Sequence, residues 1–130
     1  MKALGKREGM HLVKTHGVLY SSPDGTMKAA CTISKRYSTG APYWYGYAPR
    51  WEAFLSKAKT SFIVLGCVDR DRAYAIPFER ISKLLPHLHR TPQRHWHLVL
   101  EENPAGDIEL AVPKTGSKIG LKEFEVRLES

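Results

Sequence analysis

The feature that most constrains the fold is an apolar run at residues 61–68, with the sequence SFIVLGCV. A run of this length, bounded by the polar residues 69–72, is typical of a strand that is buried on both faces. The segment 73–76 (AYAI) is predicted to pair back with it across that polar turn. Alternation predicts that both faces are covered, with Ile63, Leu65 and Cys67 on one and Phe62, Val64 and Val68 on the other.

Turn chemistry predicts a hairpin nearer the N-terminus. Segments 11–20 and 27–37 are rich in strand-forming residues, and the residues 22–25 between them read Ser-Pro-Asp-Gly. Serine, proline, aspartate and glycine in this order favour a tight turn, so we expect the two segments to pair as a β-hairpin. A short aromatic strand is predicted to follow at residues 43–47 (YWYGY).

Two prolines predict where helices begin. Pro49 and Pro77 each precede apolar residues at helical spacing, and proline is well tolerated in the first turn of a helix. Further strands are predicted at 94–100 and 108–112, whereas the C-terminal LKEFEVRL fits either helix or strand. We therefore expect one α+β domain, with a mostly antiparallel or mixed sheet of about six strands and two short helices.

The length and composition fit this architecture. A chain of 130 residues suits one domain with a single core, which we assign to residues 1–130. No apolar run approaches the roughly 18 residues of a membrane span, and charged residues occupy the N-terminal stretch where a signal peptide would be apolar. The two cysteines lie in apolar surroundings and are interpreted as reduced thiols. We expect a cytoplasmic protein that needs no cofactor and contacts no membrane.

The charge indicates a polyanionic partner. Twenty lysine and arginine residues against thirteen acidic ones give a formal net charge of +7 and a pI near 9.5. The basic excess lies in the first hundred residues, while residues 101–130 are net acidic. Nucleic acid is the natural partner for such a surface, although a soluble protein can also be basic without a polyanionic ligand.

An aromatic cluster interleaved with cations strengthens the nucleic-acid hypothesis. Aromatic faces stack on unpaired bases and cations neutralise phosphates. Alternation places Tyr43, Tyr45 and Tyr47 on one face of their strand and Trp44 on the other, so core packing of the tyrosines is the competing interpretation. The candidate nucleic-acid-binding residues are Lys35, Arg36, Tyr43, Trp44, Tyr45, Arg50, Trp51, Arg70, Arg72, Arg90 and Arg94.

Histidines form two His-x-His pairs, at residues 87–89 and 95–97. On a strand, His95 and His97 share a face, a spacing that can chelate a metal, but no third ligand is evident from the sequence. Histidines close to a polyanion site are the preferred interpretation. Because histidine titrates near neutrality, we expect them to strengthen binding at lower pH.

A metal-dependent nuclease is the enzymatic alternative. Such sites need an acid on one strand and an acid-x-Lys on the next, where the carboxylates hold Mg²⁺ and the lysine polarises the nucleophile. Asp24 and Lys35 are the candidate residues, but Ile33 occupies the place of the second acid. An enzymatic role is therefore disfavoured, and a Mg²⁺-dependent endonuclease is the form it would take.

Part of the chain resembles known domains. The runs CTISKRY, YWYGYAPRWEAFL, FIVLGCVDRDRAYAIPFERISKLL and HWHLVL, within residues 28–100, resemble small domains of bacterial restriction and other anti-phage nuclease systems. The hairpin ending in Ala-Ile-Pro-Phe is similar to a strand pair of restriction-endonuclease-like folds. The resemblance implies contact with DNA within a restriction-modification or anti-phage defence system. A partner nuclease chain, a homodimer, and a role as a protein-interaction subunit remain open.

Overall fold

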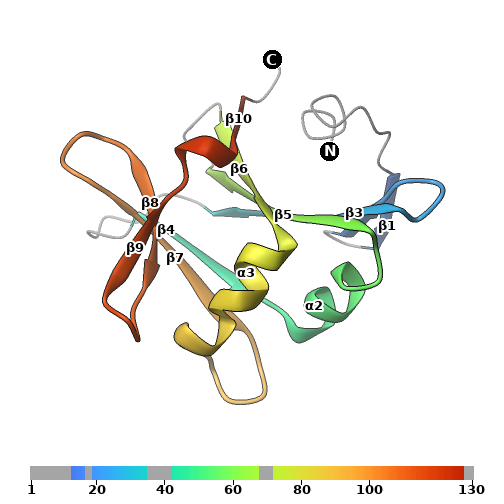
Figure 1. Cartoon of the computed structure of the whole chain (residues 1–130), viewed down its shortest axis with the longest axis horizontal. Helices are drawn as coiled ribbons and strands as arrows, with labels where there is room; N and C mark the ends of the chain where they lie inside the picture. Colours follow the sequence, from blue (N-terminus) through green and yellow to red (C-terminus); the bar gives the residue numbers. More distant parts are fainter. Residues whose placement is uncertain (1–12, 17–18, 35–41, 68–71, 128–130) are drawn as a thin grey trace.

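The computed structural model describes residues 13–16, 19–34, 42–67 and 72–127. One sheet of this α+β fold has six strands and is mixed, because β3 and β5 run parallel while the other neighbours are antiparallel (Figure 1). Its strands, in order across the sheet, are β1 (Val13–His16), β2 (Leu19–Ser21), β3 (Met27–Ser34), β5 (Thr60–Cys67), β6 (Arg72–Pro77) and β10 (Glu125–Arg127).

A second sheet has four antiparallel strands. In order, they are β4 (Tyr43–Tyr47), β7 (Trp96–Glu102), β8 (Ile108–Val112) and β9 (Ser117–Gly120). The predicted mixed sheet of about six strands is therefore present. The second sheet was not predicted, because it depends on the pairing of β4 with β7, which lies far along the chain. The class prediction, α+β with two short helices, is confirmed.

The helices begin at the predicted prolines. Helix α2 (Pro49–Leu55) starts on Pro49, and Pro77 is the N-cap of α3 (Phe78–Leu84). Single 3₁₀ turns, η1 (Leu85–His87) and η2 (Lys122–Phe124), follow α3 and precede β10. Both helices cover the same face of the six-stranded sheet, beside the four-stranded sheet (Figure 1). Within the described part of the chain, no helix has both the length and the apolar character that a membrane crossing requires.

The apolar run at 61–68 becomes β5, an interior strand between β3 and β6. Ile63, Leu65 and Cys67 join the main core between the sheets and helices, as predicted. Phe62 and Val64 lie in a smaller cluster on the opposite face, which is also buried. Val68 lies outside the described residues. Burial on both faces explains why this strand reads as a continuous apolar run rather than an alternating one.

The predicted hairpin is also present. Strands β2 and β3 pair antiparallel around the turn that contains Asp24, with Ser21 opposite Lys28. Asp24 Oδ1 accepts hydrogen bonds from Ser22 Oγ at 2.7 Å and from the Thr26 backbone amide and hydroxyl at 3.1 and 2.8 Å. The carboxylate therefore closes the turn, and these three charge-assisted bonds hold its pKa below the ordinary value of 3.8.

Candidate nucleic-acid interface

Strand β4 divides its aromatic residues between the core and the surface. Tyr43, Tyr45 and Tyr47 face inward and are almost fully buried. The Tyr45 hydroxyl donates to the Gly66 carbonyl at 2.9 Å, and the Tyr47 hydroxyl donates to Glu52 Oε1 at 2.7 Å. Burial, as the main cause, raises the pKa of both phenols well above the usual value. These side chains are core residues whose polar ends have internal partners.

The burial of these tyrosines corrects part of the predicted set of nucleic-acid-binding residues. Tyr43 and Tyr45 are 0% and 2% exposed, so a base cannot reach their rings in this structure. Trp51 is buried as well, with its ring edge-on to Tyr47 at a centroid distance of 6.0 Å. The physical reason is the amphipathic pattern of β4 and α2, in which the larger aromatic face fills the space between the two sheets.

Trp44 is the aromatic residue of this group that reaches solvent. Its side chain lies on the outer face of the four-stranded sheet and is 44% exposed. The His97 ring packs against it in a T-shaped arrangement with centroids 5.4 Å apart. His95 occupies the space above Gly46, where a Cβ atom would come within 3.2 Å of its ring. Trp44 and His95 are exposed and His97 is half-buried, and we refer to these three rings as the aromatic platform.

A tight turn before β7 joins this platform to two arginines. The amide of Thr91 donates to the His95 carbonyl at 3.1 Å, and the amide of Arg94 donates to the Thr91 carbonyl at 2.8 Å. Thr91 Oγ1 and His97 Nε2 are hydrogen-bonded at 3.0 Å. Arg94 thus lies in the same turn that holds the platform histidines. We refer to Trp44, Thr91, Arg94, His95 and His97 as the Trp44 surface.

Arg90 lies at the base of this turn and is held by two contacts. Its guanidinium stacks over the Trp96 ring at 4.2 Å from the centroid, and its Nε donates to the Arg94 carbonyl at 3.0 Å. Stacking leaves the outer edge of a guanidinium free to bind an anion. Arg90 is exposed as a residue, so its charge remains available to solvent.

The other two predicted cations among the described residues lie elsewhere. Arg50 is exposed in the first turn of α2, and Arg72 forms an ion pair with Glu125 at 2.9 Å between β6 and β10. Lys35, Arg36 and Arg70 lie outside the described residues. Of the predicted set, the structure therefore places Arg90 and Arg94 in the turn before β7, and Trp44 on the outer face of the neighbouring strand beside His97.

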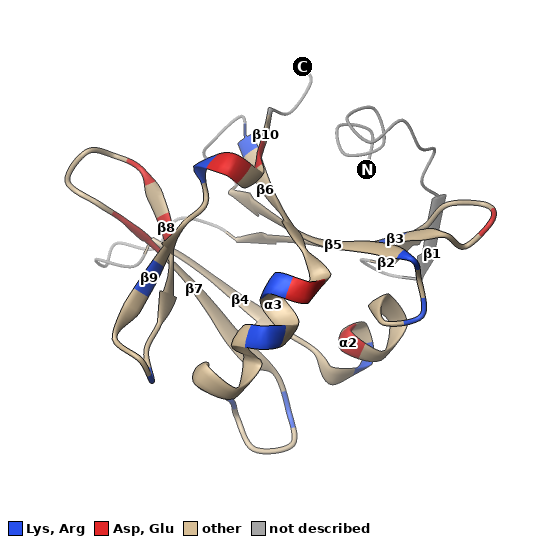
Figure 2. Cartoon of the chain, in the orientation of Figure 1, with Lys and Arg blue, Asp and Glu red and all other residues tan. Residues whose placement is uncertain are grey.

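Basic residues occur on α3 and on the turn before β7. Figure 2 shows lysine and arginine at both places and acidic residues on the hairpin of β7 and β8, while α3 and the segment before β10 carry both signs. The basic side chains of α3 and of that turn are Arg80, Lys83, Arg90 and Arg94. Like charges clustered in this way raise the local potential and attract anions.

Of the predicted nuclease pair, Asp24 lies within the described residues. Asp24 lies in the turn before β3, and its carboxylate closes that turn. Strand β3 has eight residues and ends at Ser34, so its length of about 26 Å, at roughly 3.3 Å per residue, separates Asp24 from that end. Lys35 lies outside the described residues. Asp24 is therefore a turn residue whose carboxylate has local hydrogen-bond partners, and its pairing with Lys35 stays a prediction.

The proposed metal ligands have other neighbours. His97 is hydrogen-bonded to Thr91, and His95 packs over Gly46. Among the described residues, no three histidine, cysteine or acidic side chains come close enough together to hold a metal ion. The pair is better described as part of an aromatic platform than as a ligand set.

The sequence analysis did not identify Thr91 or Gly46 as residues of this surface. The signal that could have identified Gly46 is its place within an otherwise aromatic strand, because glycine in a strand marks a close approach by another group. Thr91 follows Arg90 and precedes a proline, a pattern that indicates a turn but gives no contact partner.

Comparisons with known proteins identify no relative. No protein-family model, no curated protein and no solved structure matches the chain. The functional argument therefore depends on the residues of the Trp44 surface and their geometry.

Proposed function

We propose that the protein binds single-stranded nucleic acid, with a base stacked on Trp44 and the backbone phosphates held by Arg90 and Arg94. The observation that carries this proposal is an exposed indole on a sheet face, 5.4 Å from the His97 ring and joined through Thr91 to a basic turn. The sequence predicted a basic, aromatic DNA-binding module, and we now propose the Trp44 surface as its binding site.

Stacking and charge explain the expected affinity. Stacking of one base on an aromatic side chain contributes about 1–3 kcal/mol, and it depends little on base identity. Phosphate contacts by Arg90 and Arg94 position the strand and make binding sensitive to salt. A base within a duplex is already stacked on both faces, so the Trp44 surface favours an unpaired base.

DNA is the preferred ligand because of the resemblance to DNA-acting defence domains. Neither ring stacking nor phosphate contact distinguishes DNA from RNA.

The direct test is fluorescence anisotropy with a labelled oligothymidylate, the matching RNA and a duplex, each at two salt concentrations. We expect the single strands to bind more tightly than the duplex, and affinity to fall with salt. The Arg94→Gln variant should reduce the slope of log K against log salt by about 0.7. Lys57→Gln, at an exposed position beyond α2, is the matched control. Equal affinity for duplex, or no salt dependence, would contradict the proposal.

A protein-interaction role is the second candidate, and one specific observation favours it. Ile33 and Trp44 are the exposed large hydrophobic residues of the described chain, 74% and 44% exposed. The backbone amide of Trp44 donates to the hydroxyl of Ser34, the chain neighbour of Ile33, at 3.1 Å. The two residues are therefore close along the backbone, although Ile33 and Ser34 point to opposite faces of β3. Exposed large apolar residues often mark interfaces.

In that role, the partner would be a nuclease chain of a restriction or anti-phage system, or a second copy of this chain. Sedimentation of the Ile33→Ser variant separates the two functions. An interaction subunit loses assembly with this change, whereas a nucleic-acid binder keeps both its affinity for oligothymidylate and its sedimentation coefficient.

A further inference from the structure

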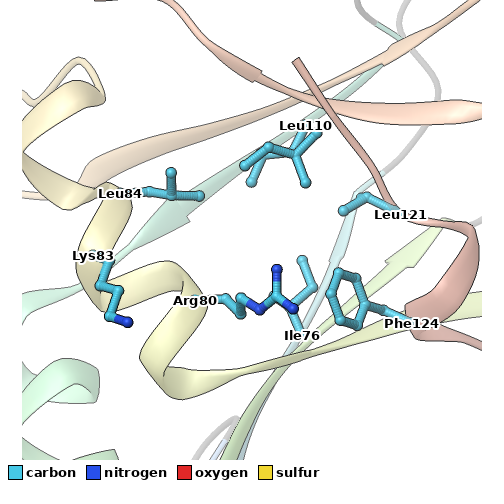
Figure 3. A pocket seen from close by; sticks show the side chains of 8 residues that line it. Ile76, Arg80, Lys83, Leu84, Leu110, Leu121 and Phe124 are labelled. Carbon is cyan, nitrogen blue, oxygen red and sulfur yellow. The ribbon is translucent and has the colours of Figure 1, made fainter. Parts of the chain in front are cut away.

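An apolar cleft lies away from the Trp44 surface, between α3, the strands β8 and β9, and η2 (Figure 3). Its volume is about 200 Å³. Six apolar side chains form its walls: Ile76, Leu84, Leu110, Ile119, Leu121 and Phe124. No carboxylate of the described residues lines it. A space of this size can hold several non-hydrogen atoms, and its walls favour an apolar occupant.

Two cations complete the lining. Arg80 and Lys83 are three residues apart on α3, so they extend from the same side of the helix. The Arg80 side chain reaches from α3 toward Phe124, and its guanidinium carbon lies 5.7 Å from the centre of that ring (Figure 3). Both residues are exposed, and neither forms an ion pair with a described residue. The cleft thus combines an apolar interior with uncompensated positive charge at its edge.

We infer that this cleft binds a small amphipathic anion, with an apolar tail between the leucine and isoleucine side chains and a carboxylate at Arg80 and Lys83. The two cations favour a negatively charged ligand, and the apolar side chains of the walls favour an apolar tail. Typical ligand pockets measure roughly 300–1,000 Å³, so the smaller volume here favours a short alkyl chain or one aromatic ring. The carboxylate would remain partly in water, which keeps its desolvation cost low.

This inference is independent of the proposed nucleic-acid binding. No residue of the Trp44 surface lines the cleft. Arg80 and Lys83 could also contact phosphate, but a nucleic-acid backbone has no apolar tail and would gain nothing from the six apolar walls. If the binding affinity depends on the apolar tail of the ligand, the cleft is a specific site. If it depends on the charge alone, the anion binds only to the basic face of α3.

The experiment is an NMR titration of the full chain, in which backbone amide shifts are followed while hexanoate is added. Acetate, which has the same charge without the tail, and hexylamine, which has the same tail with the opposite charge, are the matched ligand controls. We expect saturable shifts for hexanoate at Leu110, Ile119 and Leu121, and none for either control. Absence of saturable hexanoate shifts at these residues, or equal binding of hexylamine, overturns the inference.

Two variants test the two halves of the site. Arg80→Gln combined with Lys83→Gln should weaken hexanoate binding about tenfold, since two charge-assisted contacts are lost. Ile119→Phe, at a half-buried wall position, should fill the cleft and abolish binding while the amide spectrum stays folded. Arg90→Gln is the control for general loss of positive charge. Unchanged binding in either cleft variant contradicts the site, as does an equal loss with Arg90→Gln.

Discussion

The hydroxyl oxygen of Ser34 accepts a hydrogen bond from the backbone amide of Trp44 at 3.1 Å. This contact joins the last residue of β3, in the six-stranded sheet, to the edge strand of the four-stranded sheet. An edge strand carries backbone groups without a neighbouring strand, and a side-chain acceptor satisfies one of them. The backbone that carries the exposed indole is thereby held in place.

Removing the Ser34 hydroxyl should therefore destabilise the fold. Ser34 is buried, and Ser34→Ala leaves the Trp44 amide without this acceptor. We expect a loss of about 1–2 kcal/mol in the free energy of unfolding, measured by urea denaturation. Ser56→Ala is the matched control, because that exposed hydroxyl only donates to the nearby Ala53 carbonyl. An equal effect of the two changes would argue against a bridging role for Ser34.

Trp44→Ala should separate binding from stability. The side chain is nearly half exposed, so we expect the free energy of unfolding to change by less than about 1 kcal/mol. Loss of stacking should weaken oligothymidylate binding by about 1–3 kcal/mol, which anisotropy measures directly. Trp44→Phe keeps an aromatic face and should retain most of the affinity. Full affinity in the alanine variant would move the binding site elsewhere on the protein.

Local patterns predicted the faces of the strands well. The strict alternation in YWYGY separated Trp44 from the three tyrosines, and the structure confirms that division. The apolar run at 61–68 similarly indicated an interior strand. Both inferences depend only on which way successive side chains point, and that follows from strand geometry within a few residues.

These local patterns could not predict which distant strands pair with each other. Tyr43 lies opposite Leu100, so the four-stranded sheet depends on residues more than fifty positions apart. The choice between base stacking and core packing for Tyr45 depends likewise on the Gly66 carbonyl, which becomes a neighbour only in the folded chain. A tyrosine at a core position and one at a binding surface have the same local sequence signature. The sequence identified Arg94 as a candidate phosphate-binding residue. The hydrogen bonds through which Thr91 connects the turn of Arg94 to His97 could be seen only in the folded structure.

Glu52→Gln should weaken the junction of β4, α2 and α3. Glu52 accepts hydrogen bonds from the Tyr47 hydroxyl at 2.7 Å and from the Ser82 hydroxyl at 2.8 Å, one on each carboxylate oxygen. Glutamine offers a single, uncharged acceptor oxygen, so one hydroxyl loses its acceptor and the other loses a charged one. We expect a loss of about 1–3 kcal/mol in the free energy of unfolding. Glu79→Gln, on the exposed side of α3, is the control and should be nearly silent.

Asp24→Asn tests the charge of the carboxylate that closes the hairpin turn. The folded-state pKa of Asp24 is lowered, chiefly by the hydrogen bond from the Ser22 hydroxyl, so its ionised form stabilises the folded protein. This contribution is present above the ordinary pKa of 3.8 and is lost as the pH falls through the lower folded value.

Asparagine keeps an acceptor oxygen but carries no charge, so the variant should be less stable than the wild-type protein at neutral pH. The difference should shrink as the pH falls below 3.8, because protonation removes the charge of the wild-type residue as well. Thermal unfolding across this pH range measures the effect. Asp107→Asn, in the exposed turn between β7 and β8, is the matched control for a general change in net charge. A stability difference that stays constant with pH would show that the charge of Asp24 does not stabilise the turn.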